Sequence, residues 1–171
     1  MNQTAFKMLV SEHYRGLYRF AFALTGKESE ASDLTQQTFC IWAEKGHRLR
    51  DETKARAWLF TTLNREFLKG QRRLARFPER EFDDEHGGVP DLSPSVVREL
   101  DARLVVAALG RLDRMYRTPL ALFYLEDHSY REIAEILAVP IGTIKSRIAR
   151  GKERLGSSLK EQSASSVVRH G

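Results

Sequence analysis

Apolar residues recur at intervals of three and four along most of the first half of the chain. This spacing predicts three helices between positions 3 and 76. The first ends at Thr25-Gly26, the second closes near Lys45-Gly46, and the third contains Trp58 and ends in the basic run from Lys69 to Arg76. No stretch shows a convincing alternating pattern of a strand or the turn of a hairpin. We therefore expect an all-α N-terminal domain over residues 1–76.

The helical pattern stops at residues 77–95 and returns at Val96. Prolines and glycines punctuate this interval, and between Pro78 and Ser95 it holds six acidic residues against one arginine. That composition predicts a flexible acidic linker. We expect a second small helical domain at 96–160, followed by a serine-rich, disordered tail at 161–171.

The clearest local pattern runs from Ser129 to Leu155. Ser129 with Glu132 three residues later predicts a capped helix start. A short helix to Leu137 is followed by the turn Ala138-Val139-Pro140 and by a second helix. One face of that second helix is apolar, with Ile141, Ile144, Ile148 and Leu155. This arrangement is typical of a helix-turn-helix.

The opposite face of the second helix is small, polar and cationic. Such a face can approach the major groove closely and reach base edges or phosphates. The candidate DNA-binding residues are Thr143, Lys145, Ser146, Arg147, Ala149 and Arg150. Periodicity alone leaves a solvated basic face as an equal alternative to DNA binding. The short first helix and the tight turn favour DNA binding.

Charge and composition narrow the function classes further. The net charge is +5 although the linker is acidic, so the positive charge lies in the two helical parts. This charge suggests a polyanionic partner, and simple solubility is an equal alternative on charge alone. Cys40 is the only cysteine, which excludes an intrachain disulfide, and we expect it to be buried. No nucleophile–base pattern, phosphate loop or metal-ligand spacing occurs, so we predict no catalytic site, cofactor or metal. No signal peptide or long apolar run is seen, which predicts a cytoplasmic protein without membrane insertion.

Three segments carry a family resemblance. Residues Ser129 to Leu137 with Val139 to Arg147 resemble the promoter-reading helix-turn-helix of extracytoplasmic-function sigma factors of bacterial RNA polymerase. The run from Asp33 to Phe39 resembles that family's polymerase-binding segment. Residues Ala57 to Phe60 with Arg72-Arg73 resemble its minus-ten segment. Together with the linker, the matches cover nearly the whole chain in the family's order.

The resemblance implies a factor that binds the polymerase core, reads minus-thirty-five and minus-ten promoter elements, and is not an enzyme. It implies core-polymerase contacts at Asp33, Leu34, Gln36, Gln37 and Phe39. It implies minus-ten contacts at Arg48, Arg50, Lys54, Asn64, Arg65, Arg72 and Arg73, and assigns the helix-turn-helix residues above to the minus-thirty-five element. For Leu34 and Phe39, core packing is an equal alternative. The resemblance also allows an anti-sigma factor as a partner.

The chain departs from the family pattern at three places. Gln37 stands where the family usually has glutamate, and Ala138 stands where glycine is usual in the turn. The usual asparagine of the third helix falls on Arg65, with Asn64 one residue early. The choice between Asn64 and Arg65 for a flipped base therefore stays open.

A different function class shares part of this pattern. An ordinary helix-turn-helix regulator with a helical sensor or partner domain would explain the C-terminal half. It would leave the Asp33–Phe39 and Trp58 segments without a role.

Overall fold

A computed structural model describes residues 2–77 and 96–168. All regular elements in these two ranges are helices, which confirms the predicted all-α class. The predicted acidic linker falls, apart from Phe77, outside the described residues.

The N-terminal unit consists of three helices and two short turns. Helix α1 spans Gln3–Thr25, α2 spans Glu28–Lys45 and α3 spans Ala55–Arg76. Gly26 closes α1 in the left-handed conformation with φ of 70°, which glycine adopts without strain. The 3-10 turns η1 (Gly46–Arg48) and η2 (Glu52–Lys54) connect α2 to α3. The predicted helices are thus present, with ends close to the expected breaks.

The core of this unit is built from the inward face of each helix. Leu17, Phe20, Leu59 and Leu63 have almost no exposed surface, and the rings of Phe20 and Phe60 lie 5.5 Å apart. Trp42 from α2 meets Trp58 from α3 edge-on at 5.0 Å. Burying side chains of this size supplies most of the stability of a small helical unit.

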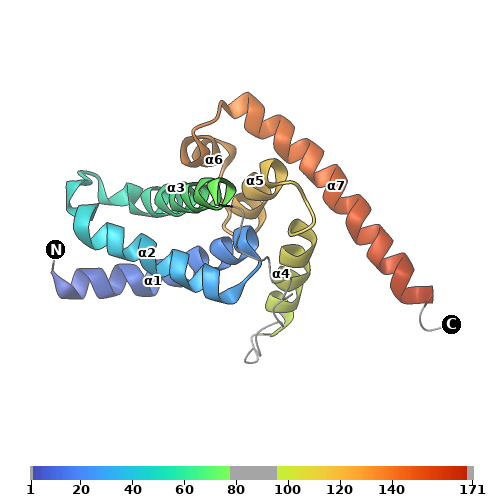
Figure 1. The fold of residues 1–171 in the computed structure, drawn as a ribbon, viewed down its shortest axis with the longest axis horizontal. Coiled ribbons are helices and arrows are strands. Elements are labelled where there is room, and N and C mark those ends of the chain that lie inside the picture. The colour runs from blue at the N-terminus through green and yellow to red at the C-terminus, as the bar shows by residue number, and fades with distance from the viewer. Residues whose placement is uncertain (1, 78–95, 169–171) are drawn as a thin grey trace.

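The C-terminal unit contains α4 (Val96–Leu109), α5 (Arg114–Tyr124), α6 (Tyr130–Leu137) and α7 (Ile141–Val168). Helices α6 and α7 form the predicted helix-turn-helix. Helix α7 then continues along α5 and projects beyond the other helices (Figure 1).

Gly151 allows α7 to lie directly on α5. A Cβ atom at this position would stand 2.6 Å from Leu120 Cδ1 and 3.3 Å from Tyr116 Cβ. Neither Leu120 nor Tyr116 is exposed, so these side chains have little room to move aside. The close contact fixes α7, and with it the outward basic face, against the unit.

The end of α7 differs from the prediction. The serine-rich composition predicted a disordered tail at 161–171, whereas the helix runs to Val168. A helix that is already formed propagates at little cost through residues such as Lys160, Glu161 and Ala164, so its end is not set by serine content alone.

The two units pack against each other. Helix α3 lies beside α6, and α1 lies beside α5 and α4 (Figure 1). The first helix of the helix-turn-helix is therefore in direct contact with the helix that carries the minus-ten candidates.

Candidate nucleic-acid interface

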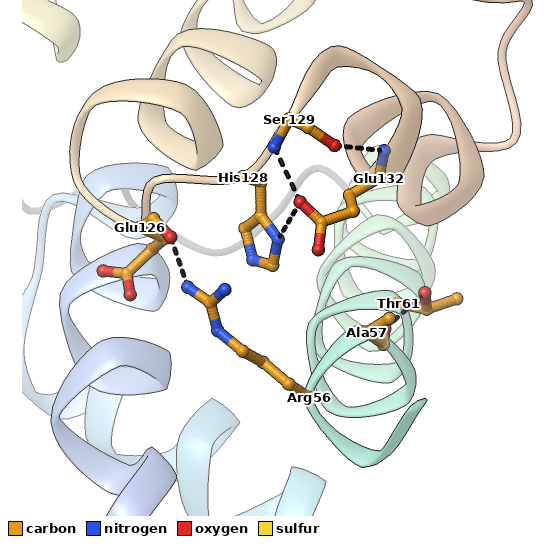
Figure 2. A network of polar contacts seen from close by, with 7 residues as sticks. All are labelled: Arg56, Ala57, Thr61, Glu126, His128, Ser129 and Glu132. Carbon is orange, nitrogen blue, oxygen red and sulfur yellow. Dashed lines mark hydrogen bonds and ion pairs between the residues drawn. The ribbon is translucent and has the colours of Figure 1, made fainter. Parts of the chain in front are cut away.

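Helix α6 begins and ends as the sequence predicts. The Ser129 hydroxyl accepts a hydrogen bond from the Glu132 N–H, and the Glu132 carboxylate accepts one from the Ser129 N–H at 2.7 Å (Figure 2). These bonds form a complete capping box and lower the pKa of Glu132. At the other end Ala138 adopts φ of 52° and ψ of 48°, the conformation for which the family usually supplies glycine. The tight turn that aims α7 is thus formed by a strained alanine.

The first turns of α7 have the predicted two-faced arrangement. Ile144, Ile148 and Leu155 are buried, while Lys145, Ser146, Ala149 and Arg150 are exposed. Thr143 and Arg147 are half-buried at the rims of the face, and Ile141 is 44% exposed, contrary to its predicted place in the core. The structure brings the six minus-thirty-five candidates onto one surface.

Two further cations on α7 turn back onto α5. The Lys152 ammonium lies 4.8 Å from the centre of the Phe123 ring. The Arg154 guanidinium lies 4.7 Å from that of Tyr116 and 3.5 Å from the Asp113 carboxylate. These contacts hold α7 in place through cation–π attraction, so Lys145 and Arg150 remain the outward cations of the first turns.

The minus-ten candidates divide into two groups according to exposure. Arg65, Arg72 and Arg73 are exposed on α3, and Arg48, Arg50 and Lys54 are exposed on the turn segment before it. Asn64 is only 6% exposed and lies on the inner face of α3, between Leu63 and Phe67. One residue is 100° of helix rotation, which places Asn64 inside and Arg65 outside.

The turn segment before α3 is anchored by close packing at Gly46. A Cβ atom at Gly46 would stand 2.6 Å from the Trp42 ring, so only glycine lets the chain pass this close. Asp51 caps η2 by accepting hydrogen bonds from the Thr53 N–H and hydroxyl, which lower the pKa of Asp51. The exposed arginines of the segment therefore project from a well-fixed backbone.

The polymerase-binding candidates on α2 also separate into two sets. Asp33, Gln36 and Gln37 are exposed on one face, whereas Leu34 and Phe39 are buried, and Phe39 stacks on Tyr14 at 6.3 Å. For Leu34 and Phe39 the structure thus favours core packing.

Gln37 donates a hydrogen bond from Nε2 to the Glu66 carboxylate on α3 at 2.9 Å. The glutamate that the family usually has here would instead place two carboxylates side by side. The amide of Gln37 therefore avoids a like-charge contact with Glu66 in this chain.

Cys40 is exposed, so its predicted burial is wrong. It stands seven residues after Asp33, which is two helical turns, and so lies on the same face as Asp33, Gln36 and Gln37. This spacing from Asp33 was the signal that could have identified it.

Family models match both units of the chain. The model described as "Sigma-70 region 2" matches residues 9–77, and "Sigma-70, region 4" matches residues 102–155. The first match covers the Asp33–Phe39 and Trp58 segments that an ordinary regulator would leave unexplained.

Curated relatives match most of the chain. It is 33% identical to the ECF RNA polymerase sigma factor SigE of Mycolicibacterium smegmatis, with 91% of this chain and 62% of the relative covered. It is 32% identical to SigL of Mycobacterium tuberculosis, with 91% and 89% covered. The chain thus spans somewhat less than two thirds of SigE and most of SigL.

Solved structures show the same arrangement of helices. The sigma factor RpoE, in complex with the anti-sigma factor NepR from Bartonella quintana, superposes with a TM-score of 0.75 at 30% identity, covering 91% of this chain and 97% of that one. CnrH, in complex with the cytosolic domain of CnrY, superposes with a TM-score of 0.67 at 26% identity, covering 94% and 90%.

Proposed function

The chain belongs to the extracytoplasmic-function sigma factors of bacterial RNA polymerase. From this premise we propose which of its surfaces binds the polymerase core and which bind the two promoter elements. Helices α1–α3 bind the polymerase core and the minus-ten element, and α4–α7 read the minus-thirty-five element. This division follows residues 1–76 and 96–160. The observation that carries it is the two-faced start of α7, whose apolar face is buried and whose cationic face is free for DNA.

At the minus-thirty-five element, Lys145 and Ser146 contact bases while Arg147 and Arg150 hold phosphates. Thr143 and Ala149 are small enough to let the helix approach the groove. At the minus-ten element, Arg65 stands at the flipped base. The six exposed minus-ten candidates, Arg48, Arg50, Lys54, Arg65, Arg72 and Arg73, can neutralise the single strand.

On the polymerase side, Asp33 and Gln36 make the polar contacts, and Cys40 lies within the contacted face. Gln37 contributes less because its amide is engaged by Glu66. Leu34 and Phe39 act indirectly by fixing α2 against α1.

The factor has no catalytic activity, cofactor or metal of its own in this proposal, and it acts in the cytoplasm, where it meets polymerase. No described helix has the length and hydrophobicity to cross a membrane. Because RpoE and CnrH are sigma factors solved in complex with NepR and CnrY, an anti-sigma factor is a further expected partner.

In vitro transcription with core polymerase over a random promoter library tests the proposal. The wild-type chain should select templates that share two spaced elements, and core polymerase alone should not. Gln36→Ala should weaken association with the core while leaving the melting temperature unchanged, and Gln3→Ala, an exposed glutamine on α1, serves as the matched control. Equal affinity of both variants for the core would remove Gln36 from the interface.

A further inference from the structure

Arg56, in the first turn of α3, is half-buried and forms no ion pair with any carboxylate in residues 2–77 and 96–168. Its guanidinium donates a hydrogen bond to the Glu126 carbonyl (Figure 2). It also lies over the Phe60 ring, 5.7 Å from the ring centre. Withdrawing a cation from water without a counter-charge is unfavourable. Arg56 therefore indicates a place for an anion.

An open cleft of about 260 Å³ lies beside Arg56, between α1, α3 and the loop that joins α5 to α6. Arg15 and Arg19 line the same cleft, and because they are four residues apart they lie on one face of α1. Gly16, which lies between them along the helix, also borders the cleft and adds no side chain to it. Three guanidinium groups from two helices thus border one cleft.

Two of these guanidinium groups keep hydrogen-bond donors for a ligand. A guanidinium group has five N–H donors. Arg19 donates from Nε to the Glu126 carboxylate at 2.7 Å and from Nη2 to the Leu125 carbonyl at 2.8 Å. Arg56 donates from Nη2 to the Glu126 carbonyl. The remaining N–H groups of Arg19 and Arg56 have no acceptor within the part of the chain that the structure describes, so they can donate to a molecule in the cleft.

The charge that borders the cleft is positive on balance. Three arginines and two glutamates line it, which gives 3 − 2 = +1 with His13 neutral. Glu126 is paired with Arg19, and the side chain of Glu12 is 74% exposed and can turn towards water. Burial lowers the pKa of His13, Glu12 opposes this shift, and the positive charge of Arg56 adds to it. The charge of Arg56 therefore acts on the groups within the cleft.

Phosphate is the anion that suits three arginines. A guanidinium group binds two oxygens of a phosphate at once, and the non-ester oxygens of a phosphate point in different directions, so they can accept hydrogen bonds from more than one arginine. A carboxylate offers only two oxygens, which lie in one plane. The cleft is slightly smaller than the volume of about 300 Å³ at which pockets for whole small molecules begin. It therefore has room for a phosphate or diphosphate group, with any larger part of the ligand extending into solvent.

From these observations we propose that the cleft binds the phosphate group of a small ligand, either an inorganic phosphate or a phosphorylated nucleoside, through Arg15, Arg19 and Arg56. This site is distinct from the proposed DNA surfaces. Arg56 and Arg65 are nine residues apart, which is about 180° of helix rotation, so they lie on opposite sides of α3. A ligand bound here stabilises the folded chain more as its concentration rises. The site would thus link the factor to the supply of a phosphorylated small molecule.

Binding can be followed in the full-length chain through the carbon-bound ring protons of its histidines in NMR spectra. His13 lines the cleft, whereas His47 is exposed in the turn segment that carries minus-ten candidates. The variants His13→Gln and His47→Gln assign the two signals. Titration with inorganic phosphate, pyrophosphate or ADP, at fixed pH and ionic strength, should shift the His13 signal saturably and at lower concentration than the His47 signal. Sodium chloride, titrated in the same way, is the control for anions in general.

A second measurement determines the affinity of each variant for pyrophosphate by calorimetry. Arg15→Gln and Arg56→Gln should each weaken binding about tenfold, because each variant loses charge-assisted hydrogen bonds to the phosphate. Arg131→Gln, on an exposed arginine of α6 that does not line the cleft, is the matched control and should bind like the wild type. Helicity and melting are recorded in parallel. Arg15 is exposed, so Arg15→Gln still tests the site if Arg56→Gln fails to fold.

The outcomes decide both the site and the source of the phosphate group. Tighter binding of ADP than of pyrophosphate would identify a phosphorylated nucleoside as the ligand, and the reverse order would identify an inorganic phosphate. A shift of the His47 signal without the His13 signal would place the anion on the DNA surface and overturn the proposal. Equal affinity of the wild type, Arg15→Gln and folded Arg56→Gln would overturn it as well.

Discussion

The imidazole of His128 lies edge-on against the phenyl ring of Phe60, with the ring centres 4.8 Å apart and the planes at 77°. The two residues belong to different units, so this contact forms only when the units are packed together. Burial, reinforced by the positive charge of Arg56, lowers the pKa of His128 from 6.5 to about 4, and the Glu132 carboxylate opposes the shift only partly. The native protein therefore holds this histidine neutral.

Stability should accordingly depend on pH between 6.5 and 4. In this window the unfolded chain binds a proton at His128 and the native protein does not, so the free energy of unfolding falls as the pH falls. His13, whose pKa is also lowered by burial, acts in the same direction. Glu126, whose pKa is raised by burial, acts in the opposite direction. Between pH 7.5 and pH 5, wild type should lose about 2 kcal/mol more than His128→Gln in urea unfolding. Parallel pH profiles of the two proteins would contradict this assignment.

Promoter choice should change when Lys145 is replaced. Lys145→Ala should alter the preferred minus-thirty-five sequence by about 1–3 kcal/mol of discrimination if the lysine reads a guanine. Arg150→Ala should weaken all promoters similarly and reduce the salt dependence of binding by about one counterion. Lys160→Ala removes the same charge from an exposed lysine farther along α7, so it serves as the control for the loss of one positive charge. Base preference identical to wild type in Lys145→Ala would show that this side chain does not read sequence.

Strand opening should depend on Arg65 and much less directly on Asn64. Arg65 is exposed on α3, so Arg65→Ala should reduce permanganate reactivity of the minus-ten region on duplex promoters. The loss should be much smaller on templates mismatched there, because unpairing is no longer needed. Asn64 is buried, so Asn64→Ala should lower the melting temperature first. Normal opening by Arg65→Ala would move the flipped-base site to Arg48 and Arg50.

Two glycines of α7 should respond in opposite ways to alanine. Gly151→Ala would drive a methyl group into Leu120 and should destabilise the fold by about 1–3 kcal/mol despite the better helix propensity of alanine. Gly156→Ala meets no atom within 4 Å and should stabilise by up to about 1 kcal/mol. Thermal unfolding measures both, and a stabilising Gly151→Ala would show that α7 is free to shift away from α5.

The strained turn at Ala138 should be relieved by glycine. Ala138→Gly removes the Cβ atom that the left-handed conformation disfavours, and it should raise the free energy of unfolding by about 1 kcal/mol. Ala43→Gly, at an exposed position inside α2, should lower it by a similar amount, because glycine costs backbone entropy in a helix. If Ala138→Gly also proved destabilising, the turn would owe its shape to the alanine methyl group.

Local patterns in the sequence determined the helices and the reading of α6 and α7. The 3.6-residue period and the Ser129–Glu132 capping box depend on residues within a few positions of one another, and the structure has both. The left-handed conformation at Ala138 was indicated by the family resemblance instead, because glycine is usual at that position. Two of the residue assignments depended on the position of a side chain around its helix as well as on its residue type. Asn64 and Arg65 differ only by 100° of rotation, and Cys40 was judged by its residue type rather than by its place on the Asp33 face.

The tertiary structure alone decided how the two units meet. Arg19 and Glu126 are 107 positions apart, and no periodicity states which of the many arginines pairs with which carboxylate. The contact depends on the carbonyls of a loop and on the burial of His128 against Phe60. These are properties of a particular packing of helices, because desolvation and steric fit exist only once the surfaces have come together.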